Sequence, residues 1–255
     1  NFEAIIESTL LYGDDAPDPV IRERLPSAGD FDLGGYRKRT PSDYDRVLCL
    51  DPEMTLAFIY ATQPKEWDKL KRHHGAEVKT RFLKRLKSEI DRRGTLDVLR
   101  NGVKDLGCRF RLAYFKPSSR LNEELQKLYQ ANLFTVIRQL KYSEKTGHSL
   151  DVVLFLNGLP LFTAELKNTL TAQNVEDAIR QYKFERDARE PLFALGRCLA
   201  HFAVDPHLVY MTTHLDGSKT VFHPFNQGWN GGAGNPPAWR NFSTAYLWEG
   251  MWARD

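Results

Sequence analysis

The sequence has little of what marks a secreted, zinc-stabilised or membrane protein. Its three cysteines, Cys49, Cys108 and Cys198, lie far apart and show no CxxC or Cys/His ligand spacing, which argues against a structural zinc site and a disulfide framework. No run of about 18 apolar residues occurs, so no membrane span is expected. The N-terminal segment is acidic and too short to be a signal peptide. These absences favour a chain that works in a reducing cytoplasm without a membrane partner.

A strong charge of one sign and a nucleotide-phosphate loop are also missing. The net charge of +3 permits an anionic partner without requiring one. The glycine-rich run at 230–237 lacks the Gly-Lys-Ser/Thr ending of a phosphate loop and is expected to be a flexible loop. No such ending occurs elsewhere in the 255 residues, so this chain should not hydrolyse ATP by itself.

What the sequence does contain is a strong strand pattern in its middle. Apolar residues dominate 133–142, 149–156 and 160–167, and short turns separate these runs, which predicts three consecutive antiparallel strands. Other strands are expected at 108–115, 199–204, 207–213 and 219–225. Helices are expected at 2–11, 66–93, 95–101, 119–131, 174–187 and 242–254. Residues 13–50, rich in Pro, Gly, Asp and Arg, are expected to form a long irregular connection. The sequence therefore predicts an α/β fold.

Three polar residues interrupt the two most apolar of these strands. Asp151 opens one strand, and Glu165 and Lys167 close the next. Acids and a lysine on apolar strands are costly to bury without partners. The arrangement suits a site that holds a divalent metal against a phosphodiester and activates a water beside it. The structural alternative is an ion pair on the sheet face, although buried ion pairs are poor stabilisers.

Strand phase sets a condition on this site. Glu165 and Lys167 share one face of their strand, because strand side chains alternate. A two-residue turn at Asn157-Gly158 would pair 156 with 159 and turn Asp151 away from Glu165. A loop that pairs 156 with 160 would place 151 opposite 165, and Pro160 favours such an irregularity. We therefore predict a bulged turn at 157–160.

An acid followed on the neighbouring strand by acid-x-lysine resembles the signature of the PD-(D/E)xK nuclease fold, with Leu150 in place of the usual proline. Beyond this motif, the chain resembles the N-terminal region of the restriction (R) subunit of type I restriction-modification enzymes, from Phe2 to the final WARD. The segments that carry the resemblance are FEAIIESTLL, LAFIYATQPKEW, DRRGTLDVLRNGVKD, FRLAYFKP, LFLNGLPLFTAELKN, AIRQYKFERD and HFAVDPHLVYMTTHL.

The resemblance implies a restriction-endonuclease-like core, a mixed β-sheet flanked by helices with an N-terminal helical elaboration. It implies that Asp151 and Glu165 are Mg²⁺ ligands, with the carbonyl of Leu166 completing the set. Lys167 would orient or help deprotonate the attacking water and steady charge on the phosphate. We expect the elaboration at 1–107 and the nuclease core at 108–255. The end of the chain reads as cut from a longer protein, at the start of a connection to a missing motor domain.

Auxiliary residues follow from the same resemblance and from charge. Family members often carry a Q-x-x-x-Y motif that handles DNA; here Gln181 fits, but position 185 is Glu and the tyrosine is the adjacent Tyr182. Phosphate contacts are expected from basic residues nearest the site, namely Arg138, Lys141 and Arg180. Glu3 and Glu7 are expected on a solvated helix face, with completion of the metal shell as the alternative. The basic helix at 77–93 is open between a solvated face and a DNA contact.

The resemblance then implies a function. The chain would be the Mg²⁺-dependent endonuclease domain of a type I restriction enzyme, cleaving double-stranded DNA in a complex with modification and specificity subunits. ATP would serve only the full-length subunit. Two alternatives stay open: a DNA-binding or docking module of the motor subunit that is inactive alone, and another PD-(D/E)xK enzyme such as a repair nuclease.

Overall fold

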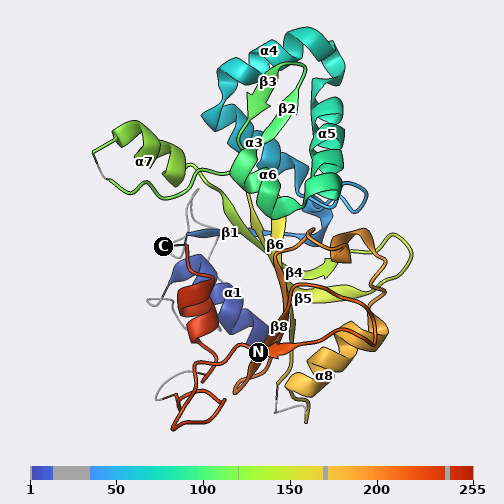
Figure 1. The fold of residues 1–255 in the computed structure, drawn as a ribbon, viewed down its shortest axis with the longest axis vertical. Helices are drawn as coiled ribbons and strands as arrows, with labels where there is room; N and C mark the ends of the chain where they lie inside the picture. The colour runs from blue at the N-terminus through green and yellow to red at the C-terminus, as the bar shows by residue number, and fades with distance from the viewer. Residues whose placement is uncertain (1, 14–34, 120, 169–171, 239–241, 255) are drawn as a thin grey trace, which may run out of the picture.

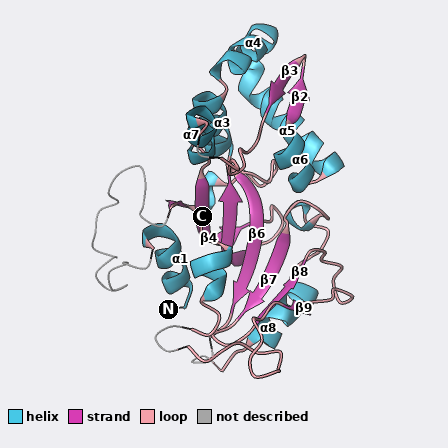
Figure 2. Cartoon of the chain, turned by 60° about the vertical axis from the view of Figure 1, so that its left-hand side comes forward, coloured by secondary structure: helices cyan, strands magenta, loops and turns pink. Residues whose placement is uncertain are grey.

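A seven-stranded mixed sheet forms the centre of the protein (Figures 1 and 2). The computed structural model describes residues 2–13, 35–119, 121–168, 172–238 and 242–254. The strand order is β1-β4-β5-β6-β7-β8-β9, with β1 parallel to β4, β6 parallel to β7 and the other neighbours antiparallel. The strands are β1 Tyr36–Arg39, β4 Phe134–Lys141, β5 Ser149–Leu156, β6 Leu159–Leu166, β7 Ala200–Val204, β8 Val209–Thr212 and β9 His223–Pro224.

Helical segments cover both faces of this sheet (Figure 1). Helix α1 (Phe2–Tyr12) and the π-helical turn Leu247–Met251 pack on one face, where Phe2, Ile6 and Trp248 meet alternate residues of the strands. Helix α8 (Val175–Arg180) and the π-helical turn Gln181–Glu185 lie on the other face. Because β5 and β6 are covered on both sides, they are apolar along most of their length.

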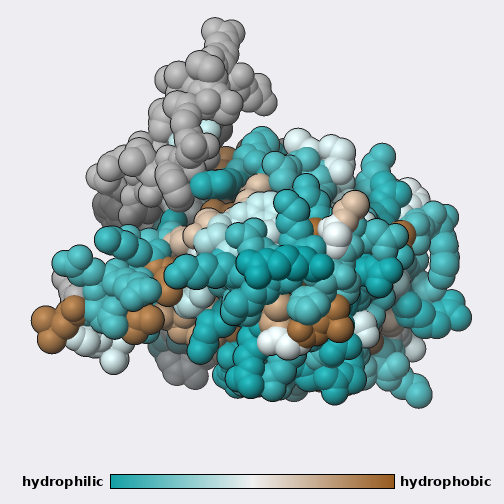
Figure 3. Space-filling model, turned by 90° about the horizontal axis from the view of Figure 1, so that it is seen from above, coloured by the Kyte–Doolittle hydropathy of each residue, from teal (hydrophilic) through white to brown (hydrophobic). Residues whose placement is uncertain are grey.

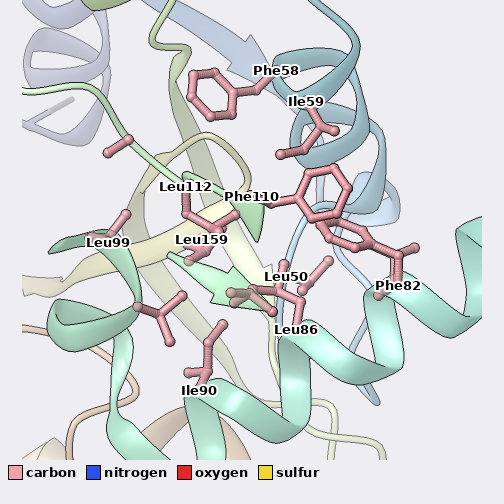
Figure 4. Packing of buried hydrophobic residues seen from close by; sticks show 14 of the residues in the cluster. Leu50, Phe58, Ile59, Phe82, Leu86, Ile90, Leu99, Phe110, Leu112 and Leu159 are labelled. Carbon is pink, nitrogen blue, oxygen red and sulfur yellow. The ribbon is translucent and has the colours of Figure 1, made fainter. Parts of the chain in front are cut away.

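A helical lobe (residues 51–116) stands at one end of the sheet (Figure 1). The lobe has its own hydrophobic core, in which Trp67, Phe82 and Phe110 are in edge-to-face contact. Apolar residues at the ends of β5 and β6, among them Leu159, close the base of this core (Figure 4). The elements of the lobe are α3 Pro52–Thr62, α4 Pro64–His74, a 3-10 turn Gly75–Glu77, α5 Val78–Arg93, α6 Thr95–Asn101, and the hairpin β2 Val103–Asp105 with β3 Cys108–Phe110. Helix α7 (Glu123–Gln130) then leads back to the sheet.

The lobe is joined to the sheet through the β5–β6 turn. The carboxylate of Asp51 accepts the backbone N–H of Met54 and so caps α3, while the Asp51 backbone N–H donates to the carbonyl of Gly158 at 2.8 Å. Thr55 donates its hydroxyl to the carbonyl of Asn157 at 3.0 Å. Gly158 has a φ of +81°, and a Cβ there would lie 2.3 Å from the Asp51 carbonyl oxygen. The junction therefore requires glycine for both conformation and space.

We expect Gly158→Ala to destabilise the protein by roughly 2–4 kcal/mol, because the left-handed backbone and the backbone overlap add. Urea denaturation followed by circular dichroism measures this loss. Gly147→Ala is the matched control, because nothing lies within 4 Å of its added Cβ and its φ is not left-handed. Equal stability of the two variants would show that the junction tolerates a side chain.

The predicted α/β fold with a mixed sheet flanked by helices is confirmed, and so are the three central strands. The helix expected at 66–93 is two helices, broken at Gly75, whose φ is +58°. Residues 108–115 give only a short strand outside the main sheet, and the helices expected at 119–131, 174–187 and 242–254 are shorter. Strand β1 and helix α3 were not predicted. The connection expected at 13–50 falls largely on 14–34, outside the described residues.

The predicted turn at 157–160 is wrong in its detail and right in its effect. Asn157 and Gly158 form a two-residue turn with both φ values positive, and Leu156 pairs with Leu159. The one-residue shift comes just afterwards, between Pro160 and Phe162, where Leu161 is the extra residue of a bulge. Beyond the bulge, Val152 pairs with Ala164, and this register is the predicted one, which places 151 opposite 165.

Within the described part of the chain, no helix is both long and apolar enough to cross a membrane.

Candidate active site

Asp151 and Glu165 occupy the next step of the β5–β6 ladder. The paired residues end at Val152 and Ala164, and the same register places Asp151 opposite Glu165. The Asp151 carboxylate continues the ladder, because its Oδ2 accepts the backbone N–H of Leu166 at 2.7 Å. Directly opposed residues of an antiparallel pair have Cβ atoms about 4.5–5.5 Å apart. The two acids therefore stand side by side on the sheet face that α8 covers.

Glu165 is fully buried, and Arg186 is its one ion-pair partner among the described residues. Arg186, at the end of the π-helical turn, donates to Glu165 Oε1 from Nε at 2.8 Å and approaches the same oxygen with Nη2 at 2.7 Å. The other oxygen, Oε2, is buried without a hydrogen-bond partner among the described residues. Burial, and then the charge of Asp151, raise the pKa of Glu165 to about 8, although Arg186 opposes this shift. Burial next to Asp151 thus disfavours the charged form of Glu165.

Lys167 lies one step further along the same face. Its backbone N–H donates to the carbonyl of Val204, and its amine donates to the side-chain oxygen of Gln181. Gln181 begins the π-helical turn that follows α8, and this turn also carries Arg186 toward Glu165. Among the described residues, no ion pair joins Lys167 to Asp151 or Glu165, so the three residues do not form the structural ion pair considered from the sequence.

Tyr182 lies in the core and not on a DNA-facing surface. It is fully buried, and its hydroxyl is 2.8 Å from the hydroxyl of Thr163, which in turn is 2.8 Å from Nδ1 of His201. A side chain in this position cannot reach a phosphate. The expected auxiliary role of Tyr182 in contacting DNA does not agree with its burial, whereas Gln181 is beside Lys167.

The other auxiliary residues differ in their freedom to bind phosphate. Arg138 is held by Glu7 and Glu3, each at 3.2 Å, on the α1 face of the sheet. Arg180 is exposed and pairs with Asp177 within its own helix. Lys141 is exposed at the end of β4 and has no ion pair in the described ranges. Of the three, Lys141 has the freest charge.

The expectation that Glu3 and Glu7 lie on a solvated helix face is wrong. Glu7 is 7% exposed, and both acids turn toward the sheet, where Lys38, Arg138 and Gln139 bind them. Helix α1 reads as amphipathic, but its charged side is covered because basic side chains of β1 and β4 approach it. The acids of α1 are thus part of the surroundings of the site.

Two residues that shape the site were not predicted from the sequence. Arg186 has no motif spacing, and only the fold brings it to Glu165. Gln139 has a φ of +51° inside β4, which is rare for a non-glycine residue. Its side-chain NH₂ donates to Asp151 Oδ1 at 3.0 Å and to Glu3, and its side-chain oxygen accepts a hydrogen bond from the hydroxyl of Ser149. Gln139 therefore connects α1 to Asp151.

The donor set fits a magnesium ion. Mg²⁺ is usually held by one or two carboxylates and keeps several waters, and Asp151 and Glu165 supply two carboxylates on one sheet face. The unpartnered Oε2 of Glu165 is an oxygen that such a cation would satisfy. No cluster of three or more Asp, Glu, His or Cys side chains suited to a metal is found in the described ranges. A binding site here would therefore take its remaining ligands from water, backbone or substrate.

Comparison with known proteins identifies a family, but it finds no curated protein and no solved structure that matches the chain. The family described as type I restriction enzyme R protein N terminus (HSDR_N) matches residues 64–220, more than half of the chain. The matched range contains α4 to α6, the three central strands with Asp151, Glu165 and Lys167, and the turn with Gln181 and Arg186. The chain belongs to the family of type I restriction enzyme R protein N-terminal regions.

Proposed function

We propose that this chain is the Mg²⁺-dependent endonuclease domain of a type I restriction enzyme and hydrolyses phosphodiester bonds of double-stranded DNA. One observation carries the proposal: Asp151 and Glu165 are adjacent on one face at the end of two buried strands, with the amine of Lys167 on the same face. Family membership supports the link to restriction, with modification and specificity subunits as partners in a complex.

The residues have separate roles in this reaction. Asp151 and Glu165 would hold the ion, and the carbonyl of Leu166 is a third candidate ligand. Bound Mg²⁺ would supply positive charge beside the scissile phosphate and lower the pKa of a water. Lys167, held by Gln181, orients the attacking water and steadies charge on the phosphate. The water loses a proton to solvent as its oxygen forms a bond to phosphorus, the bond to the leaving sugar oxygen breaks, and that oxygen takes up a proton from solvent.

A plasmid-nicking assay with Mg²⁺ tests this function. We expect supercoiled plasmid to be nicked in the presence of Mg²⁺ and to stay intact in EDTA. If the isolated chain is inactive, the same measurement is made on the full restriction complex that contains it. Nicking that persists in EDTA, from a preparation free of other nucleases, would contradict the proposal.

Magnesium binding should depend on pH through Glu165. With the pKa raised to about 8, this carboxyl holds a proton in the folded, metal-free protein between pH 5 and 8. Because metal ligands must be deprotonated, Mg²⁺ affinity should rise by up to about tenfold per pH unit as the pH approaches 8 and then level off. Without metal, stability should fall over the same interval, because the folded state binds the extra proton and loses it as pH rises.

Isothermal titration with Mg²⁺ at pH 6, 7, 8 and 9 measures this dependence, and repeating it in buffers of different ionisation enthalpy counts the protons released. Glu165→Gln should bind weakly with little change over pH 6–9. An affinity that is independent of pH in the unmodified protein would show that Glu165 does not titrate on binding.

A further inference from the structure

The net positive charge of the chain lies in the helical lobe. Residues 51–116 contain sixteen Lys and Arg against nine Asp and Glu, a net charge of +7. The whole chain has 36 against 33, so the remaining residues have 20 against 24 and a net charge of −4. The overall charge of +3 thus hides a basic lobe on an acidic remainder. Seen from the end that the lobe forms, the surface is largely hydrophilic (Figure 3).

The basic side chains of the lobe divide into paired and unpaired sets. On α5, the cations Arg81, Lys87 and Arg92 are bound to Glu77, Asp91 and Glu89. Others are exposed and have no ion pair within the described part of the chain; these are Lys65, Lys71, Arg72, Lys79, Lys84, Arg100, Lys104, Arg109 and Arg111. The acids of α5 are therefore already satisfied, and the excess positive charge is left without partners.

Part of this excess is held in an unfavourable arrangement. Lys104 and Arg109 are directly opposed on the β2–β3 hairpin, and both are exposed. Like charges directly opposite each other across two strands destabilise the pair. The neighbouring acid Glu66 binds Lys69 and the backbone N–H of Arg109, and Asp105 binds His74. The nearby acids are thus engaged elsewhere, and the two opposed cations are free to bind an anionic ligand.

The hairpin lies beside α4, which extends the same basic surface. A pocket between them is lined by Lys69, Arg72 and His73 from α4 and by Leu106, Gly107 and Cys108 from the hairpin. We define the basic surface of the lobe as Arg72, Lys104 and Arg109. Cations spread over a helix and a hairpin fit the regularly spaced charges of a nucleic-acid backbone.

We propose that the basic surface of the lobe binds the phosphate backbone of duplex DNA, as a contact separate from the candidate active site. The proposal takes only the kind of substrate from the proposed function. The base of the lobe meets the β5–β6 turn at Gly158, and Glu165 lies near the other end of β6, about 20 Å from that turn at the usual rise per residue. The strand from the base of the lobe to Glu165 thus spans the length of about six base pairs, and a duplex that contacts both the basic surface and the active site must be longer than this.

Salt dependence of binding tests this inference. Affinity for a duplex of about 20 base pairs is measured by fluorescence anisotropy in EDTA at several salt concentrations, for the unmodified chain and for Arg72→Ala/Lys104→Ala/Arg109→Ala. Each lost phosphate contact lowers the slope of log K against log salt by about 0.9, so we expect a decrease of about 2.7. The matched control is Arg81→Ala/Lys87→Ala/Arg92→Ala, which removes the same charge from paired positions and should change the slope much less.

Several results would overturn the inference. These are an unchanged slope in the first variant, equal decreases in the two variants, or tighter binding of an RNA of equal length than of duplex DNA. The residues substituted in both variants lie at the surface, and thermal melting checks that both variants fold. Because cleavage cannot occur in EDTA, the binding slope reports the lobe contact and the plasmid-nicking assay reports the nuclease site, so the failure of one is distinguishable from the failure of the other.

Discussion

Replacing Lys167 by alanine should lower the rate of plasmid nicking by about 10²–10³-fold, the usual loss when one positioned donor to the developing charge is removed. Binding of Mg²⁺ should be kept, because the two acids that would hold it stay in place. The amine is fixed by Gln181, so Gln181→Ala should lower the rate less, by releasing the amine without removing it. Rates at saturating Mg²⁺, measured in the isolated chain or in the full complex, give these values.

Asp151→Ala should abolish nicking and weaken Mg²⁺ binding together. Lys145→Ala is the matched control for Lys167→Ala, because Lys145 is an exposed lysine in the β4–β5 connection. It should nick at the unmodified rate. Activity that survives both Lys167→Ala and Asp151→Ala would refute the site, and loss of activity in Lys145→Ala would show that general charge, and not position, matters.

The second large effect is expected when Arg186 is replaced, and it should appear in the free energy of unfolding and not in the rate of nicking. Arg186→Met leaves Glu165 buried beside Asp151 without a counter-charge, and breaking a buried pair in this way costs about 3–5 kcal/mol. The loss should be limited below pH 8, where Glu165 can hold a proton, and should be largest near pH 9. Urea denaturation in EDTA at pH 6 and pH 9 measures both values.

A double-mutant cycle isolates the interaction between these two residues. Arg186→Met should cost much less in the Glu165→Gln background, because the uncompensated charge is then absent. Mg²⁺ should raise the melting temperature of Arg186→Met more than that of the unmodified chain, since the cation replaces the missing positive charge. Arg186 Nη2 also donates to the backbone carbonyl of Ser149 at 2.9 Å. Equal destabilisation in both backgrounds would show that Arg186 acts through packing or through this hydrogen bond and not through Glu165.

The parts of the site that follow from local pattern were predictable. Strand alternation placed Glu165 and Lys167 on one face, and the need to bring Asp151 to that face required a one-residue shift, which the structure has. The position of the shift was not predictable, because a two-residue turn and a following bulge have the same net effect on register as a longer loop. Pro160 indicated an irregularity nearby but not its place.

Other features depend on contacts between distant segments. Arg186 reaches Glu165 only because a π-helical turn follows α8, and Gln139 reaches Asp151 only because its backbone is left-handed inside a strand. Strand β1, with the sequence YRKR, has no apolar alternation, and its pairing comes from β4. For the same reason Glu7 looked solvated in isolation: the residues that cover it belong to β1 and β4.

A crystal soaked with Mn²⁺, which takes oxygen ligands as Mg²⁺ does and is visible by anomalous scattering, tests the central claim most directly. We expect one anomalous peak between the carboxylates of Asp151 and Glu165, with Lys167 on the same face. A peak elsewhere, or carboxylates that point to opposite faces of the sheet, would contradict the proposed site.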